Sequence, residues 1–123
     1  MQNACPFCYL DSGRDIILET DFSFCIFDKY PVSTGHMLII PKRHSTNYLE
    51  NTNEEKIDLW FLVDRAVELI KSKYKPNGFN IGININEAAG QTVFHTHIHV
   101  IPRYFGDIDE PRGGVRTILN SHY

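Results

Sequence analysis

One long segment of the sequence has the period of an α-helix, and the residues at its start mark where it begins. Thr52 and Glu55, in the run TNEE, have the spacing of a capping box, in which each side chain bonds a backbone N–H group of the first turn. Turn-forming residues in KPNG at 75–78 end the segment. The sequence therefore predicts a helix from Asn53 to Tyr74, whose apolar stripe contains Trp60, Val63, Val67, Ile70 and Tyr74 and is widened by Leu59, Leu62, Ala66 and Leu69.

Short apolar runs separated by turn residues lie on both sides of this helix, as is typical of β-strands. Three runs precede the helix and two follow it. An antiparallel sheet covered by one helix, an α+β fold, accommodates this order, and the length suits a single domain over 1–123. The expected strands lie in RDIILET (14–20), DFSFCIFD (21–28), GHMLIIPKRH (35–44), FNIGININ (79–86) and TVFHTHIHVIP (92–102).

The apolar stripe of the predicted helix is wider than a single contact with a sheet requires. Packing into the core of the same chain is one interpretation, and burial against a second copy of the chain is the other. We expect a homodimer, because a lone chain is expected to expose to water much of Leu59, Leu62, Val63 and Ala66.

The charge of the chain argues against some classes of partner. With 12 Lys and Arg against 15 Asp and Glu, the formal net charge is −3, which does not favour binding to nucleic acid or to an anionic membrane surface. The first residues have no signal-peptide pattern, and no apolar run reaches membrane-spanning length. We therefore expect a cytoplasmic protein, in which three cysteines do not form a disulfide framework.

Three of the six histidines alternate within five positions, in FHTHIHVIPR at 94–103. On a strand they would share one face, while the other face would supply the core through Phe94, Thr96, Ile98 and Val100. His95 and His99 would then be about 13 Å apart, too far for one ion whose bonds to nitrogen are about 2 Å long. The three histidines are therefore expected to have different functions, unless they lie by chance on a solvated edge strand.

The chemistry of neutral imidazole indicates what such a row can do. One ring can attack as a nucleophile near neutral pH, and a second can donate a proton or a hydrogen bond to a leaving oxygen. In the preceding loop, EAAGQT at 87–92, the N–H groups of Gly90, Gln91 and Thr92 are placed to line an anion site. An ordinary turn is the simpler interpretation of the loop alone, but beside the histidines phosphate chemistry is favoured.

Taken together, these segments resemble a known family. GQTVFHTHIHVIPR resembles the His-x-His-x-His-x-x signature of the histidine triad (HIT) superfamily, DKYPVSTGHMLIIPKRH its upstream segment and NIGININEAAGQ its penultimate strand and loop. The resemblance extends from about Cys5 to Arg103. It implies a five-stranded antiparallel sheet with one long helix and a short N-terminal segment, and a homodimer. It also implies hydrolase or transferase activity at the α-phosphate of nucleotides, through a covalent nucleotidyl-histidine.

The resemblance also implies roles for individual residues. The middle histidine, His97, would be the nucleophile, and His99 would contact the α-phosphate or the bridging oxygen. Asp28 would hold the ribose hydroxyls, although a turn residue is the simpler interpretation of that position alone. His36 is expected to brace the fold, with a role in the site as the alternative. No organic cofactor is implied. The other positions expected to contact the nucleotide, which we expect to be a purine nucleotide, are Ile26 and Phe27 at the base and Asn84, Gly90, Gln91, Thr92 and Val93 near the phosphates.

Two departures from the family pattern leave the substrate open. Asp28 is typical of the nucleoside phosphoramidate branch, whereas Gln91 and Thr92 resemble the dinucleoside polyphosphate branch. The tail EPRGGVRTILNSHY, at 110–123, lacks the tryptophan-bearing end of the phosphoramidase branch. The chain most resembles the short bacterial HIT hydrolases, and the expected substrates are dinucleoside polyphosphates or nucleoside phosphoramidates.

CPFC at 5–8 is a Cys-x-x-Cys pair, which suits either a redox site or half of a zinc site. The strand-then-helix context of a thioredoxin-like redox site is missing from the sequence. Some HIT proteins that this segment resembles bind zinc through such a pair and two histidines, which implies a structural zinc site at Cys5, Cys8, His44 and His95. That site would leave the last two histidines of the row for the chemistry. Cys25 is expected to be a small core residue.

Two other classes of protein are alternatives to an enzyme. A nucleotide-binding or scaffolding module would bind a nucleotide without turnover, and a metal or redox protein would depend on CPFC. The complete triad and the unobstructed GQT loop favour the enzyme.

Overall fold

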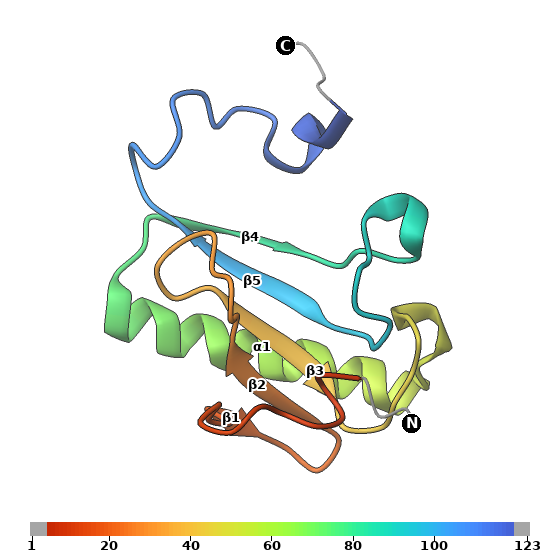
Figure 1. Cartoon of the computed structure of the whole chain (residues 1–123). Coiled ribbons are helices and arrows are strands. Elements are labelled where there is room, and N and C mark those ends of the chain that lie inside the picture. Colours follow the sequence, from red (N-terminus) through yellow and green to blue (C-terminus); the bar gives the residue numbers. More distant parts are fainter. Residues whose placement is uncertain (1–4, 120–123) are drawn as a thin grey trace.

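The computed structural model describes residues 5–119, which form one antiparallel sheet and one long helix (Figure 1). The helix, α1, extends from Asn53 to Tyr74, and short 3-10 turns lie at Tyr48–Glu50, Glu87–Ala89 and Gly114–Leu119. The predicted α+β fold, with its helix between the third and fourth strands, is confirmed. The strands, in the spatial order β1-β2-β3-β5-β4, are Leu18–Glu19 (β1), Ser23–Phe27 (β2), Met37–Pro41 (β3), Gly78–Gly82 (β4) and Ile98–Arg103 (β5).

α1 lies against one face of the sheet, and the strands cover most of its apolar stripe. Leu59, Leu62, Val63 and Ala66 are buried in one cluster with residues of β2, β3 and β5. The expectation that a lone chain exposes these four side chains is therefore wrong, because the sheet of the same chain buries them. The large apolar side chains that α1 leaves exposed are instead Ile57, Trp60 and Phe61, at 73%, 41% and 54% of their surface. Within residues 5–119, none of the helices has both the length and the apolarity that a membrane span requires.

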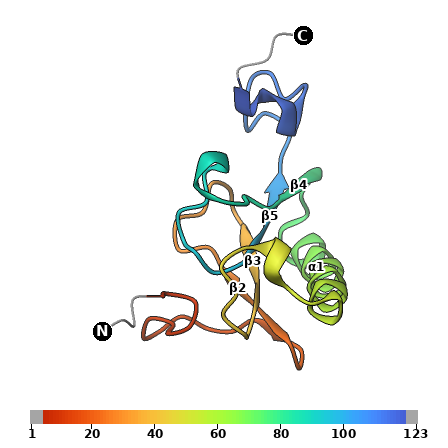
Figure 2. The ribbon, with the colours of Figure 1, turned by 90° about the vertical axis from the view of Figure 1, so that its right-hand side faces the viewer.

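The segment that precedes β1 covers the second face of the sheet. Phe7 packs there into a separate apolar cluster with side chains of β2 and β3, namely Phe24, Ile26, Leu38 and Ile40. Figure 2 shows the N-terminal segment and α1 on opposite sides of the sheet. Since successive side chains of a strand point to opposite faces, two covered faces require apolar residues at consecutive positions of β2 and β3.

The histidine segment is a regular strand only in its second half. β5 begins at Ile98, so His95 and His97 precede the strand instead of belonging to it. The backbone there bonds to a loop, because the Thr96 N–H donates to the Ser45 carbonyl at 2.8 Å instead of to a neighbouring strand. The first two histidines are therefore free of the strict alternation of a paired strand.

Other predicted strands are also shorter than expected. Residues 14–20 contribute only the two residues of β1, and β4 ends at Gly82 instead of reaching Asn86. Phe94 is 47% exposed, so the prediction that it joins the core is wrong, although its predicted partners Thr96, Ile98 and Val100 are buried.

The start of α1 is fixed by the predicted capping box and by one arginine. Thr52 Oγ1 accepts a hydrogen bond from the Glu55 N–H at 3.1 Å, and the Glu55 carboxylate accepts one from the Thr52 N–H at 2.9 Å. Arg43 donates to both oxygens of this carboxylate, at 2.8 and 2.9 Å, and Asn51 adds a bond of 3.1 Å. These donors, Arg43 above all, lower the pKa of Glu55 from its ordinary value of 4.5 to about 2.

We expect Glu55→Gln to lower the free energy of unfolding by about 1.5–3 kcal/mol at pH 7, since it removes the charge from a buried, multiply bonded carboxylate. The pKa of Glu55 is depressed on folding, so this stabilisation is fully present above a pH of about 4.5 and is lost as the pH falls toward 2. Urea unfolding of both proteins at pH 7 and near pH 2.5 measures the difference. The control is Glu54→Gln, an exposed residue of the same turn, which should change stability by less than about 0.5 kcal/mol. A difference that stays undiminished in acid would contradict this account of the helix start.

Candidate active site

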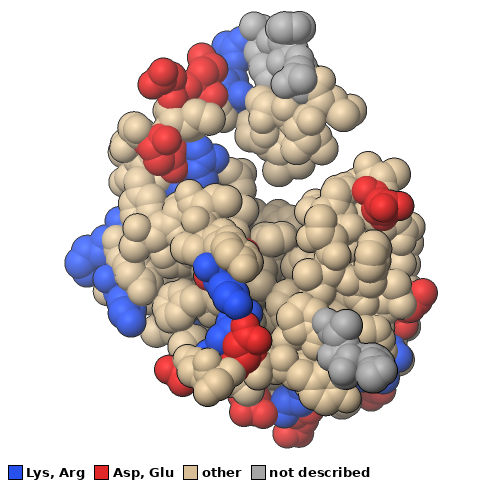
Figure 3. Space-filling model, in the orientation of Figure 1, with Lys and Arg blue, Asp and Glu red and all other residues tan. Residues whose placement is uncertain are grey.

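A cavity of about 520 Å³ opens on the face of the sheet opposite α1, beneath the N-terminal segment and beside the loops that follow β2 and precede β5. Figure 3 shows the molecule from the side opposite α1. Residues other than Lys, Arg, Asp and Glu cover most of this face, and basic and acidic side chains lie next to each other near the centre of the picture. Another cavity of about 520 Å³, between the end of β5 and the tail, is lined by no histidine or cysteine among residues 5–119. The residues predicted from the sequence that line the first cavity are Asp28, Asn84, Gly90, Thr92, Val93, His97 and His99.

The ring of His97 is oriented by a hydrogen bond to the backbone of His95. Its Nδ1 lies 2.8 Å from the carbonyl oxygen of His95, and a carbonyl accepts only from an N–H, so Nδ1 carries the proton. In the neutral ring Nε2 is then unprotonated. Burial lowers the pKa of His97 below its ordinary value of 6.5, against the opposing effects of the carbonyl and Asp28. The ring is therefore neutral near pH 7, with a free nitrogen lone pair in the form that a nucleophile needs.

The protonation of His99 is set by His36. The Val32 N–H donates to Nδ1 of His36 at 3.2 Å, so the proton of the neutral His36 ring is on Nε2. That Nε2 lies 3.0 Å from Nδ1 of His99 and 3.3 Å from Oδ2 of Asp28. Burial lowers the pKa of His99 to about 4, with the neighbouring His97 and His36 adding to the effect, so the ring is neutral. A neutral His99 that accepts at Nδ1 carries its own proton on Nε2 and can donate it as a hydrogen bond.

His36 combines both of the roles that the sequence left open, a brace of the fold and a residue of the site. It is buried, as a brace would be, but it also lines the cavity and contacts His99. It lies one residue before β3, which pairs with β5 so that Leu38 is opposite His99. The pairing of two distant segments brings the two rings together, and no local pattern in the sequence shows it.

Asp28 follows β2 and has two sets of contacts. Its Oδ1 accepts the Tyr30 N–H at 2.9 Å, which is the turn contact that the simpler interpretation predicted. Its Oδ2 faces Nε2 of His36 at 3.3 Å and Nδ1 of His99 at 3.9 Å. The carboxylate thus lies at the boundary between the cavity and the histidine row.

Two residues expected to touch the nucleotide have other partners. Phe27 lies on the α1 face of the sheet, where its ring packs edge-on against Tyr74 at 6.4 Å between centroids, so it does not reach the cavity. Its neighbour Ile26 lies on the cavity side but is fully buried beneath Phe7 and Leu38. Strand alternation separates the two, because adjacent residues of β2 cannot face the same side.

The loop before the histidines is braced by Gln91 instead of offering it to a ligand. The Gln91 amide donates to the carbonyls of Thr46 and Val93, at 2.6 and 3.1 Å, and its oxygen accepts the Asn86 N–H at 2.7 Å. Two of the three N–H groups expected to bind an anion are also used inside the loop, since those of Gly90 and Gln91 donate to backbone carbonyls. The proposed anion site of three consecutive N–H groups is therefore not formed in this structure.

Several cavity residues escaped the analysis of the sequence. Phe7 lines the cavity and lies edge-on to His97, with ring centroids 5.1 Å apart. Lys29 pairs with Asp11 at 2.7 Å, and Arg14 donates to the Phe27 carbonyl at 2.7 Å. The only signal for Phe7 in the sequence was its position between two cysteines. The Lys29–Asp11 pair joins residues 18 positions apart, and no local motif reveals such a contact.

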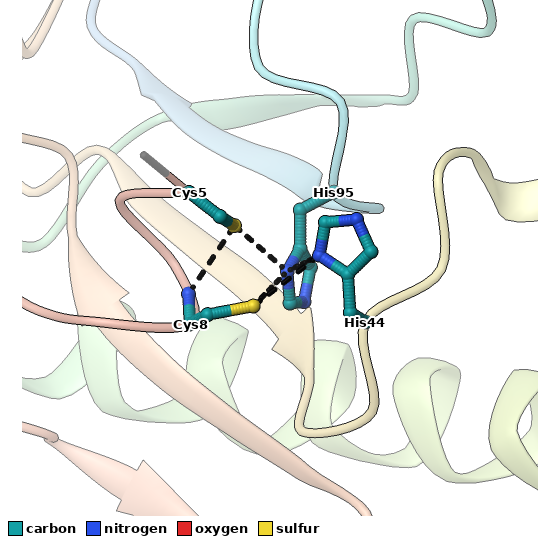
Figure 4. A group of neighbouring side chains, drawn as sticks. All are labelled: Cys5, Cys8, His44 and His95. Atoms are coloured by element: carbon teal, nitrogen blue, oxygen red, sulfur yellow. Dashed lines mark hydrogen bonds between the residues drawn. The ribbon is translucent and has the colours of Figure 1, made fainter. Parts of the chain in front are cut away.

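The four residues predicted to bind zinc come together beside the cavity (Figure 4). Their four potential ligand atoms, one per residue, all lie within 4.8 Å of one another. The sulfurs of Cys5 and Cys8 lie 3.3 and 3.5 Å from Nδ1 of His95, and Nδ1 of His44 lies 3.2 Å from both the Cys8 sulfur and Nδ1 of His95.

These distances suit a tetrahedral ion. Bonds of about 2.3 Å to sulfur and about 2.1 Å to nitrogen place neighbouring ligands of zinc roughly 3.4–3.8 Å apart, so these four distances of 3.2–3.5 Å need to change by only a few tenths of an ångström. Nε2 of His95 lies 2.8 Å from the Pro41 carbonyl, which fixes the proton there and leaves Nδ1 free as a ligand. The donor set of two thiolates and two imidazoles is one that structural zinc sites use. We refer to Cys5, Cys8, His44 and His95 as the Cys2His2 cluster.

Comparison with known proteins shows the family. The family model of the HIT domain matches residues 11–106 of this chain. Over 95 residues, 77% of this chain and 64% of the relative, the chain is 37% identical to a bis(5'-adenosyl)-triphosphatase of Dictyostelium discoideum. Over 106 residues, 84% of this chain and 54% of the relative, it is 39% identical to an adenylylsulfatase of Arabidopsis thaliana. The chain belongs to the HIT domain family, whose signature its histidine row carries.

Solved structures agree with this assignment. A hypothetical histidine triad nucleotide-binding protein of Sulfolobus tokodaii superposes with a TM-score of 0.78 at 38% identity, over 86% of this chain and 73% of that one. A zinc-bound histidine triad family protein of Mycobacterium smegmatis superposes with the same TM-score at 34% identity, over 85% and 78% of the two chains. The fold predicted from the resemblance, a five-stranded antiparallel sheet with one long helix, is thereby confirmed.

Proposed function

We propose that this protein is a nucleotide hydrolase or transferase that cleaves at the α-phosphate of nucleotide conjugates, through a covalent nucleotidyl intermediate on His97. The observation that carries the proposal is the hydrogen bond of 2.8 Å from Nδ1 of His97 to the His95 carbonyl. It leaves an unprotonated Nε2 on a neutral imidazole in the wall of a cavity of about 520 Å³, a size that suits a small-molecule ligand.

In the first step, the lone pair of His97 Nε2 attacks the α-phosphorus and a P–N bond forms. The bond from phosphorus to the leaving group breaks, and the leaving atom takes the electron pair. A leaving nitrogen also takes up a proton from solvent and departs as an amine, whereas a leaving phosphate oxygen can depart as the anion. The His97 ring becomes cationic, because Nδ1 keeps its proton, and the His95 carbonyl that accepts the hydrogen bond from this N–H stabilises the positive charge. His99 assists by donating a hydrogen bond from Nε2 to the departing atom or to a phosphoryl oxygen.

In the second step, water attacks the same phosphorus and the P–N bond breaks. The electron pair returns to His97 Nε2, and the water gives up a proton to solvent. If another acceptor replaces water, the same intermediate transfers the nucleotide, which is why hydrolase and transferase activities are proposed together. Asp28, beside His36 and His99 in the cavity wall, is proposed to hold the ribose hydroxyls, with Asn84 and Thr92 near the phosphates.

A panel of substrates tests this proposal. Diadenosine polyphosphates, adenylyl sulfate and adenosine phosphoramidates are compared by kcat/KM. The first two are chosen because relatives of this chain include a bis(5'-adenosyl)-triphosphatase and an adenylylsulfatase, and the third because Asp28 is typical of the nucleoside phosphoramidate branch. Cytidine and guanosine conjugates in the same panel test the proposed preference for a purine. Turnover of at least one class, with a radiolabelled nucleotide trapped on His97 after denaturation, is the expected result. Saturable nucleotide binding without any turnover would point instead to the nucleotide-binding or scaffolding alternative.

We propose zinc as the resident metal of the Cys2His2 cluster. The ion would join the N-terminal segment to the segments that carry His44 and His95 and would supply no reacting atom, because all four ligand positions come from the protein. The redox alternative is less favoured. Residues 5–17, which carry the pair, form neither the strand nor the helix of a thioredoxin-like redox site. Cys25 is buried in the core with a pKa raised to about 12 by that burial, in keeping with the expectation from the sequence.

We also propose a homodimer, on a corrected physical basis. The residues of α1 that remain to be covered are Ile57, Trp60 and Phe61, and a second copy would bury them. Light scattering at micromolar concentration should return twice the chain mass, and Phe61→Glu should shift it toward the monomer, because a carboxylate in an apolar contact loses its hydration. The matched control is Phe22→Glu, which places the same charge at another half-exposed phenylalanine and should leave the mass unchanged. A monomer mass for the unaltered chain would overturn the proposal.

The cytoplasmic location expected from the sequence stays a prediction.

A further inference from the structure

Phe7 connects the Cys2His2 cluster to the nucleophile. It lies between Cys5 and Cys8, both of which belong to the cluster. Its ring is edge-on to His95 at 5.9 Å and to His97 at 5.1 Å between centroids, with interplanar angles of 85° and 67°. It is buried and at the same time forms part of the cavity wall. One aromatic ring therefore contacts a predicted metal ligand, the proposed nucleophile and the space where a nucleotide would lie.

The segment that carries Phe7 has few other attachments. Residues 5–17 contribute no strand to the sheet. The Asp11–Lys29 ion pair, at 2.7 Å, has both side chains about half exposed, and exposed pairs of this kind contribute at most about 1 kcal/mol. Arg14 adds one bond to the backbone of β2, seven residues away from Phe7 along the chain. Ile17, at the far end of the segment, donates its N–H to the Cys25 carbonyl at 2.8 Å. The contacts nearest to the Phe7 ring are its own burial beside Ile26 and Leu38, the packing of Leu10 on the same cluster, and the contacts of Cys5 and Cys8 with His44 and His95.

We propose that Phe7 is a positioning residue that couples occupancy of the Cys2His2 cluster by zinc to the site of nucleotide binding. With zinc bound, the two cysteines are fixed to His44 and His95, and the Phe7 ring is held against His97 as one wall of the cavity. Without zinc, the chain on both sides of Phe7 loses its attachment to His44 and His95, and the ring, held only by its apolar contacts, no longer keeps its place in the cavity wall. This inference rests on the proposed function for the identity of the ligand as a nucleotide.

Coupling of this kind acts equally in both directions. If zinc strengthens nucleotide binding by a given factor, the nucleotide must strengthen zinc binding by the same factor. The inference can therefore be tested without measuring catalysis. Adenosine monophosphate is the probe, since it carries the groups that the cavity is proposed to hold.

The experiment uses the full chain and measures both halves of this cycle. Calorimetry gives the affinity for adenosine monophosphate of zinc-loaded and chelator-treated protein, at a temperature where circular dichroism verifies that both are folded. Competition with a chromophoric chelator gives the zinc affinity with and without saturating nucleotide. In the unaltered protein we expect roughly a 5- to 20-fold effect, equal in the two directions. Phe7→Ala should reduce the factor to about one with the zinc content unchanged, and Phe7→Leu should restore part of it, because an apolar side chain still fills the wall.

Phe24→Leu is the matched control, since Phe24 belongs to the same apolar cluster but lines neither the cavity nor the Cys2His2 cluster. It should keep the full factor. A second measurement covers the case in which the chelated protein unfolds: among zinc-loaded proteins, Phe7→Ala should lower kcat and nucleotide affinity by about tenfold each, with Phe7→Leu in between. An unaltered coupling factor in Phe7→Ala, or zinc-loaded Phe7→Ala with unchanged kinetics and affinity, would overturn the inference. Coupled binding without turnover would instead refute the proposed catalytic function alone.

Discussion

Replacement of His97 by alanine is expected to lower turnover by about four orders of magnitude or more while nucleotide affinity changes by less than about tenfold, or 1.4 kcal/mol. The size of the loss follows from the role of the ring. Without Nε2 no P–N bond forms, and the reaction has to proceed by direct attack of water without an enzyme-bound intermediate. Binding is affected far less, because the ribose and phosphate contacts proposed for Asp28, Asn84 and Thr92 remain.

The neighbouring histidine supplies the comparison for this variant. His99→Ala should lower turnover by about 10²–10⁴-fold, because it removes a hydrogen-bond donor and not the nucleophile, and it should still allow a labelled nucleotide to be trapped on His97. Steady-state kinetics and peptide mapping of the acid-labile adduct distinguish the two variants. Near-normal kcat in His97→Ala, or an adduct mapped to residue 99, would show that the nucleophile has been assigned to the wrong ring.

Removal of zinc is expected to lower the melting temperature by roughly 12–16 °C. Zinc present at about 1,000 times its dissociation constant stabilises the folded state by about 4 kcal/mol, and each kcal/mol corresponds to about 3–4 °C for a domain of this size. The ion has this effect because it binds four side chains that are adjacent only when the chain is folded: Cys5, Cys8, His44 and His95. Differential scanning calorimetry before and after dialysis against a chelator measures the shift.

Elemental analysis of cysteine variants separates the metal from general destabilisation. Cys5→Ala should purify without zinc, whereas Cys25→Ala, which alters a buried cysteine outside the cluster, should keep one zinc per chain even though it lowers stability. Absence of zinc from the unaltered protein, purified without chelators, would count against the metal site. So would full zinc content in Cys5→Ala.

Local signals in the sequence were sufficient to predict the helix. Its bounds, Asn53 and Tyr74, coincide with those expected, because a capping box at one end and a turn at the other act within a few residues. The packing of one helix on an antiparallel sheet followed from the positions of the apolar runs along the chain, and the resemblance to the HIT superfamily agreed with it. The Cys2His2 cluster also came together as predicted, although its residues are separated by up to 90 positions, because the family pattern supplied what spacing could not.

What the sequence did not predict depends on contacts between distant segments. β5 begins only at Ile98 because the Thr96 N–H bonds to the Ser45 carbonyl instead of to a neighbouring strand. The side-chain amide of Gln91 likewise donates to the Thr46 carbonyl. In both bonds the two residues are about 50 positions apart. The position of Phe27 is a different case. Strand alternation alone would have separated it from Ile26, and assigning both residues to one pocket contradicted the two-residue period of β2.

His95 meets two requirements with two different parts of the residue. Its imidazole belongs to the Cys2His2 cluster, while its carbonyl sets the tautomer of His97. Every amino acid carries that carbonyl, so the chemistry places no demand on the side chain at this position as long as the backbone keeps its path. Loss of the cysteines during evolution would therefore release residue 95 to vary, and a chain without the metal could retain the nucleophile in its reactive form by other means of holding the same backbone.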